Sequence, residues 1–159
     1  METERQLETR NKKPATSKWR EQFMLYAPLV IWIAVIFLLS SSQGSMNQTS
    51  RIIRPLLEFF FPAASPDTIT FYHGIIRKLA HFTEYAILGF LSMRAFAWGR
   101  AILVASVILI GVASIDEINQ SFNPARTGSP VDVLLDVAGG ATAILIIALV
   151  RRRRRRTAE

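Results

Sequence analysis

The chain has 159 residues, a length that favours a single domain. Half of its residues are hydrophobic, the mean hydropathy is +0.27, and the absence of cysteine excludes disulfides, thiolate metal sites and a cysteine nucleophile. The net charge of +7 is compatible with nucleic acid binding, but most basic residues flank hydrophobic stretches near the two ends. This is the positive-inside pattern of a membrane protein, so we predict no nucleic acid partner.

The first predicted element is a membrane span over residues 19–40, preceded by a disordered, basic and polar tail over residues 1–18. No charged residue occurs between Phe23 and Leu39. A bilayer core about 30 Å thick requires about 20 mostly apolar helical residues, so this run with its flanks is long enough. The long basic segment before it, with no clear small-residue cleavage site after it, favours an uncleaved anchor over a signal peptide.

The longest predicted connection covers residues 40–71. Within it, an apolar stripe over residues 52–61 is interrupted by Arg54 and Glu58 and is too short to cross a bilayer. This pattern predicts a short interfacial or re-entrant helix, and a helix packed on the bundle is an equally good interpretation.

Three further spans are predicted over residues 72–96, 101–122 and 130–150. The fold class is therefore all-α, an integral membrane bundle of four transmembrane helices with a short interfacial or re-entrant helix between the first and second. The bundle forms one domain over residues 19–150, followed by a basic tail over residues 151–159.

Basic residues also predict the orientation of the bundle. Both tails are basic, and the short turn between the second and third spans carries Arg94 and Arg100. The other two connections carry fewer basic residues for their length, so both termini are expected in the cytoplasm.

Ionisable side chains inside the predicted spans are the most informative residues, because each costs at least about 2.5 kcal/mol near the bilayer centre. Helical spacing places those of the second span on one face, and the topology places those of the third and fourth spans at the same level, in the outer half of the bundle. The predicted ligand-binding set is Arg77, Lys78, His81, Glu84, Tyr85, Asp116, Glu117, Gln120, Arg126, Asp132 and Asp136.

Two sequence blocks resemble the signature of VanZ-like membrane proteins. Residues 77–89 (RKLAHFTEYAILG) are similar to the family pattern K-x-x-H-F-x-E-Y, and residues 114–126 (SIDEINQSFNPAR) to D-E-x-x-Q-x-F-x-P-x-R. A downstream D-x-x-x-D-x-x-G-G pattern matches residues 132–140. The resemblance covers residues 40–150 and implies a small multi-pass protein of the bacterial cytoplasmic (inner) membrane, in a family named for a protein linked to teicoplanin resistance.

In the first functional hypothesis, the protein has an outward-facing polar pocket that binds a lipid-linked or lipid-like envelope ligand. Binding of this ligand affects glycopeptide and lipoglycopeptide susceptibility. In this hypothesis Arg77, Lys78 and Arg126 meet phosphates or carboxylates of the ligand. The predicted partners are membrane lipids and a lipid-linked envelope precursor, and the protein is compatible with an oligomer.

The second function is an intramembrane enzyme in which His81 and Glu84 are the candidate acid–base residues. The known hydrolase and phosphate-binding motifs H-E-x-x-H, G-x-S-x-G and the Walker lysine are absent from the sequence. Transport or proton relay through the same carboxylates is a third function, although four spans are few for a monomeric transporter.

The remaining alternative is a structural network of ion pairs in a membrane interaction protein, since charges buried in membranes usually pair with one another. No cofactor is predicted and no metal site is assigned. A divalent cation stays open as an alternative, because carboxylates are suitable ligands for one. The carboxylates in question are those of Asp116, Glu117, Asp132 and Asp136.

Overall fold

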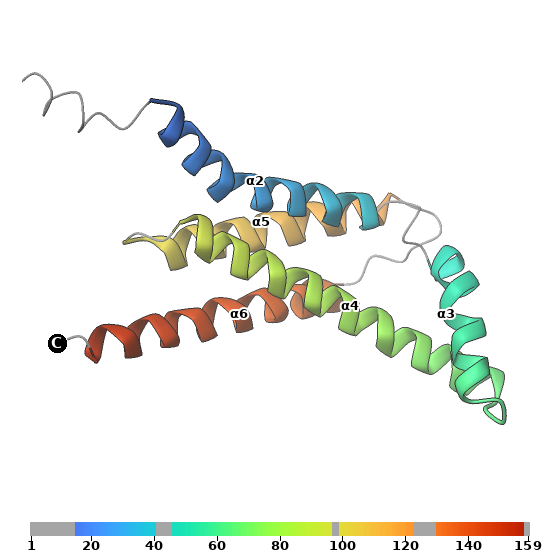
Figure 1. The fold of residues 1–159 in the computed structure, drawn as a ribbon. Coiled ribbons are helices and arrows are strands. Elements are labelled where there is room, and N and C mark those ends of the chain that lie inside the picture. The colour runs from blue at the N-terminus through green and yellow to red at the C-terminus, as the bar shows by residue number, and fades with distance from the viewer. Residues whose placement is uncertain (1–14, 41–45, 97–98, 123–129, 158–159) are drawn as a thin grey trace, which may run out of the picture.

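The computed structural model describes residues 15–40, 46–96, 99–122 and 130–157. These residues form five α-helices and no strand, which confirms the predicted all-α fold (Figure 1). The helices are α2 (Ala15–Ser40), α3 (Met46–Phe60), α4 (Pro66–Ala95), α5 (Ala101–Ser121) and α6 (Pro130–Arg156).

Helix α4 is the centre of the bundle. It packs most extensively against α6 and also contacts α5 and α2, whereas α3 contacts α4 alone among the described helices. In Figure 1 the N-terminal part of α4 extends beyond the other long helices, and α3 lies across it. The His73 ring and the Ser50 hydroxyl, 3.5 Å apart, link these two helices. The predicted short helix therefore exists and packs on α4.

Two helix boundaries differ from the predicted ones. Pro66 and Asp67, which lie within the connection predicted over residues 40–71, are instead the first residues of α4, whose N-cap is Ser65. The Ser65 hydroxyl accepts a hydrogen bond from the backbone N–H of Thr68 at 3.2 Å, and proline is tolerated at this position because its missing N–H has no helical partner there. At the other end of the chain, α6 continues as a helix through the arginine run to Arg156.

Among the described residues, three helices are long and apolar enough to cross a membrane, namely Lys18–Ser40, Ala101–Ser121 and Val131–Arg156. Helix α4 does not meet the same criterion of length and composition in the described chain. It carries several charged residues along its length, which are Asp67, Arg77, Lys78, Glu84 and Arg94. The three apolar helices indicate a membrane protein, and a fourth transmembrane helix formed by α4 stays a prediction.

Glycines bring α4 and α6 into close contact. A Cβ atom added to Gly89 would lie 2.5 Å from the carbonyl oxygen of Gly140, and one added to Gly139 would meet the backbone of Phe82. Small residues allow two helix backbones to approach this closely in a membrane, so these glycines serve the packing of α4 against α6. Because Phe82 follows His81 directly, this contact places His81 beside the first half of α6.

Candidate functional site

Polar side chains from four helices meet in the apolar interior of the bundle. We define the buried polar cluster as Ser40 of α2, His81 and Tyr85 of α4, Asp116 and Gln120 of α5, and Asp136 of α6. All are buried except His81, which is partly exposed. Asp116 and Asp136 are 1% and 3% exposed, so both carboxyl groups are buried within the bundle.

Hydrogen bonds hold one oxygen of Asp116 in place. The Tyr85 hydroxyl donates to Asp116 Oδ2 at 3.2 Å, and Gln120 Nε2 donates to the same oxygen at 2.7 Å. The Gln120 amide also donates to the Ser40 hydroxyl at 3.0 Å. The spacing of four residues along α5 places Gln120 one turn from Asp116 on the same helical face. Asp116 is therefore positioned by side chains from α4 and from its own helix, and Ser40 of α2 supports that arrangement.

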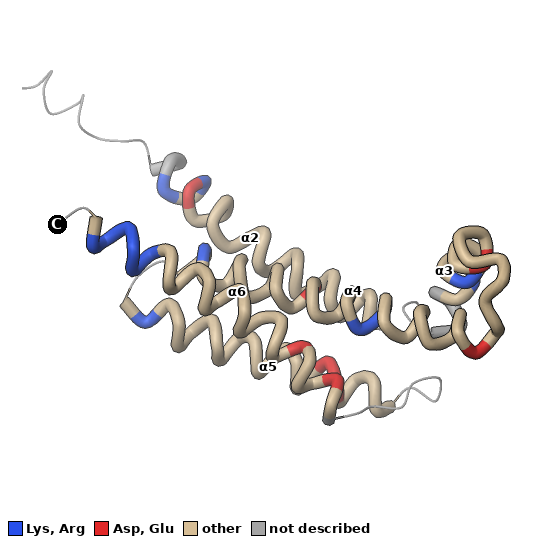
Figure 2. Tube along the Cα trace, turned by 90° about the horizontal axis from the view of Figure 1, so that it is seen from below, with Lys and Arg blue, Asp and Glu red and all other residues tan. Residues whose placement is uncertain are grey.

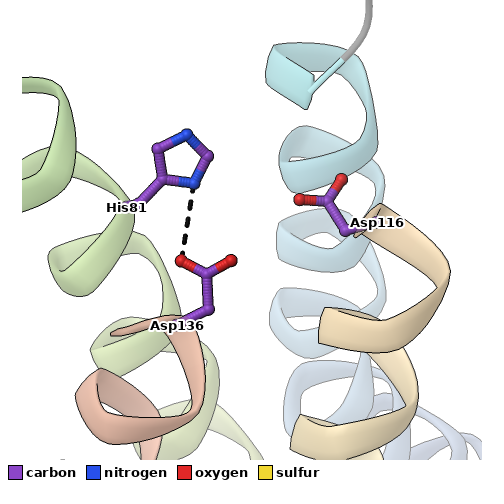
Figure 3. Close-up of side chains that lie close together, drawn as sticks. All are labelled: His81, Asp116 and Asp136. Atoms are coloured by element: carbon purple, nitrogen blue, oxygen red, sulfur yellow. Dashed lines mark ion pairs between the residues drawn. The ribbon is translucent and has the colours of Figure 1, made fainter. Parts of the chain in front are cut away.

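The second half of the cluster lacks such partners. His81 Nδ1 lies 3.5 Å from Asp136 Oδ1, the pair drawn with a dashed line in Figure 3. Both atoms are buried and have no hydrogen-bond partner in the described chain, and Asp116 Oδ1 is buried and unpartnered in the same way. Leaving a polar group buried without a hydrogen bond typically costs about 1–3 kcal/mol. Three such atoms lie in this cluster, and two of them face each other across the His81–Asp136 contact.

Ligand-type atoms of three residues converge at this point. His81, Asp116 and Asp136 each offer one nitrogen or oxygen, and these atoms all lie within 4.8 Å of one another. In Figure 3 the carboxylates of Asp136 and Asp116 face the same space between the helices, and His81 stands above Asp136. These residues are the ones in the described chain that could hold a metal ion.

The predicted ligand-binding residues divide into two groups. The structure brings together His81, Tyr85, Asp116, Gln120 and Asp136. Outside the cluster, Arg77, Glu84, Glu117 and Asp132 are half-buried and Lys78 is exposed, whereas Arg126 lies outside the described residues. Neither Arg77 nor Lys78 forms an ion pair with Asp116 or Asp136 in the described part of the chain.

Sequence reasoning missed two contacts with the cluster and its surroundings. Ser40 was interpreted only as the end of the first span, yet it is 4% exposed and pairs with Gln120. Trp32 donates its indole N–H to the backbone carbonyl of Glu84 at 2.9 Å and so fixes α2 against α4. In the sequence, Ser40 differs from its neighbours only in ending an apolar run with a hydroxyl. Because hydroxyl residues are common at helix ends, this feature does not indicate a contact with Gln120.

Charge is distributed unevenly along the bundle. Figure 2 shows Lys and Arg at the end where α6 finishes and α5 begins, and acidic residues of α5 toward the other end. At the basic end, Arg151 donates to the Met93 carbonyl at 2.7 Å and Arg94 donates to the Met24 carbonyl at 3.2 Å. The buried polar cluster thus lies away from the arginine run, as expected if basic residues mark the cytoplasmic side.

A family model described as VanZ/LLP1 matches residues 23–151, a range that begins in α2, ends in α6 and contains the whole buried polar cluster. No curated protein matches the chain. No solved structure matches it either.

Proposed function

Because the chain belongs to the VanZ/LLP1 family, we propose that it is a cell-envelope membrane protein whose buried polar cluster and nearby α4 cations bind the headgroup of a lipid-linked or lipid-like envelope ligand. One observation carries the proposal: Asp116 and Asp136 are buried in an apolar bundle, and each has an oxygen that makes no hydrogen bond in the described chain. Ionisable residues at membrane depth usually mark a functional site, since an unneeded charge there is expensive.

The chemistry of the cluster favours a headgroup with hydroxyl or amine donors. The oxygens of Asp116 and Asp136 that make no hydrogen bond in the described chain are acceptors, so they suit the hydroxyls of a sugar or the amine of an amino acid. Arg77 precedes His81 by four residues on α4, which corresponds to a rise of about 6 Å. A guanidinium about one helical turn from His81, with Lys78 next to it in the sequence, is suited to a phosphate of the same ligand. A phosphate-linked sugar on a lipid combines both features.

Binding measurements test this proposal. The full-length chain in nanodiscs would be titrated with undecaprenyl phosphate and with a lipid-linked peptidoglycan precursor. We expect Arg77→Gln to weaken binding of both ligands, and Asp116→Asn to weaken binding of the sugar-bearing precursor by at least about 10-fold, the loss of one charge-assisted hydrogen bond. Arg154→Gln, at the far end of α6, is the matched control and should bind like the parent. Equal affinities for all four proteins would contradict the proposal.

A cellular measurement addresses the effect on antibiotics. Expression of the parent chain in a susceptible Gram-positive host is expected to lower susceptibility to teicoplanin, and Asp116→Asn is expected to abolish the effect at equal membrane abundance. Reduced susceptibility that is identical in parent and variant would separate the resistance effect from the buried polar cluster.

A second candidate function is acid–base catalysis on an envelope lipid or precursor. The observation that favours it is the position of His81 against Asp136, since a carboxylate beside an imidazole orients the ring for proton transfer. Mass spectrometry of the precursor after incubation with the parent chain tests it. A product that forms with the parent and not with His81→Gln would establish catalysis, whereas unchanged precursor would leave binding as the function.

A further inference from the structure

We propose that His81, Asp116 and Asp136 bind one divalent transition-metal ion, of the type of Zn²⁺ or Mn²⁺, between α4, α5 and α6. The proposal deepens the proposed function and rests on it for the role of the ion, which would bind both carboxylates and take a sugar hydroxyl oxygen of the headgroup as a further ligand, in place of direct contact between the carboxylates and that hydroxyl. The metal site itself rests on the geometry, burial and charge of these three residues.

The spacing of the ligand atoms fits a common centre. Zn²⁺ binds imidazole nitrogen and carboxylate oxygen at about 2.0–2.2 Å in tetrahedral geometry, which places two ligands of one ion about 3.3–3.6 Å apart. The observed separation of His81 Nδ1 and Asp136 Oδ1 is 3.5 Å, and neither atom makes a hydrogen bond in the described chain. The third ligand atom lies within 4.8 Å of both, a distance that small side-chain rotations can close.

The surroundings of Asp116 resemble the outer shell of a metal site. Its Oδ2 is occupied by the Tyr85 hydroxyl and the Gln120 amide, which leaves Oδ1 buried and unpartnered on the same carboxylate. Carboxylates that bind metals are usually hydrogen-bonded through their remaining oxygen, because such bonds orient the ligand. Tyr85 and Gln120 thus have the role of second-layer partners, and Ser40 in turn holds Gln120.

Charge gives an independent reason for a cation. Two carboxylates lie deep in the bundle, and the only basic side chain within ion-pair distance of either, in the described chain, is the His81 ring. Two buried negative charges with a single imidazole beside them are strongly unfavourable in a low-dielectric interior. A divalent cation neutralises both, and the donor set of one imidazole and two carboxylates suits Zn²⁺ or Mn²⁺ better than thiolate-seeking metals.

Direct metal binding tests the site without any lipid ligand. The full-length chain, carrying a purification tag without histidine and stripped with chelator, would be dialysed against Zn²⁺ or Mn²⁺ and its metal content measured by mass spectrometry. We expect one ion per chain. His81→Gln, Asp116→Asn and Asp136→Asn are each expected to weaken binding by more than about 100-fold, since outer partners alone are worth about 10–100-fold.

The chain offers matched controls. His73→Gln changes the only other histidine, which lies on the same helix and pairs with Ser50. Asp67→Asn changes an exposed carboxylate in the first turn of α4. Both variants should retain one ion per chain. Gel filtration of every protein checks the fold, and a ligand variant that aggregates is replaced by Asp136→Glu or Asp116→Glu, which keep the charge and should bind with reduced affinity.

The outcomes separate this proposal from the proposed function. Absence of a stoichiometric ion in the parent chain, or binding that survives Asp136→Asn, overturns the metal site. If the chelator-stripped chain still binds the lipid-linked precursor with unchanged affinity, the ion has no role in ligand recognition. The proposed function then stands without it. If the ion binds as expected and the precursor does not, the metal site stands and the proposed function fails.

Discussion

Gly89 of α4 faces Gly140 of α6 so closely that a Cβ atom at Gly89 would lie 2.5 Å from the Gly140 carbonyl oxygen. The obstacle is backbone rather than a flexible side chain, so one helix must move before any larger residue fits. This contact sets the distance between the helices that carry His81 and Asp136 and thereby the width of the buried polar cluster. The glycines are part of how the site is positioned.

The close contact between Gly89 and Gly140 predicts that even a substitution to alanine at Gly89 reduces stability. Gly89→Ala is expected to destabilise the protein by about 1–3 kcal/mol, the usual cost of overpacking a tight interior. Gly74→Ala on the same helix is the control, because a Cβ atom there meets nothing within 4 Å. Alanine at that position is expected to leave stability equal or to raise it by up to about 1 kcal/mol. Thermal unfolding in detergent measures both, and equal midpoints for the two variants would contradict the prediction.

Removal of the Tyr85 hydroxyl is also expected to reduce the stability of the protein. Tyr85→Phe removes a donor to the buried Asp116 carboxylate, and hydrogen bonds to charged groups contribute about 1.5–3 kcal/mol. Tyr72→Phe is the control, since the half-exposed Tyr72 ring stacks on Phe61 and its substitution keeps that ring contact. Unfolding midpoints in the same detergent distinguish them. A Tyr85→Phe variant as stable as Tyr72→Phe would mean that the Asp116 bond contributes little.

The hydrogen bonds that Tyr85 and Gln120 donate to Asp116 also predict an effect on metal affinity. Tyr85→Phe and Gln120→Leu each remove a bond that orients Asp116, so both are expected to weaken Zn²⁺ binding by about 10–100-fold while one ion per chain is still bound at saturation. Titration of the stripped chain measures the dissociation constants. Unchanged constants would place Asp116 outside the set of metal ligands.

The stability of Asp136→Asn distinguishes a ligand site from a structural ion pair. In the chelator-stripped protein we expect this variant to unfold at the same temperature as the parent or higher, because functional sites with unsatisfied or like charges often reduce stability. Breaking a satisfied buried pair instead costs about 3–5 kcal/mol. A clear drop in the midpoint of Asp136→Asn without metal would therefore identify the His81–Asp136 contact as structural and favour a membrane interaction protein.

Topology reporters test the orientation on which the outward-facing site depends. Fusions after Gly44 and Asn123 are expected to report the outside of the membrane, and a fusion after Trp98 the inside, because basic residues at both ends and around that turn favour the cytoplasm. The opposite pattern would place the cluster in the inner half of the bilayer and would rule out an envelope ligand approaching from outside.

The helices were predictable because their signals are local. Uncharged apolar runs mark α2, α5 and α6, and the amphipathic stripe marks α3. The start of α4 was missed, because Pro66 and Asp67 occur equally in turns and in first helical turns. The extension of α6 through Arg151–Arg156 was also missed, because a basic run after an apolar one commonly marks only the membrane boundary.

The sequence by itself determined the fold class, the family signature and the helices that supply polar side chains, since hydropathy and helical spacing are properties of each segment alone. Only the tertiary structure decided which polar atoms meet. The rotation and depth of each helix are set by contacts between distant segments, such as Gly89 with Gly140 and Gln120 with Ser40. Those contacts turn Asp116 and Asp136 toward His81 and leave Lys78 exposed. The spacing of residues along one helix does not show which side chains of other helices they meet.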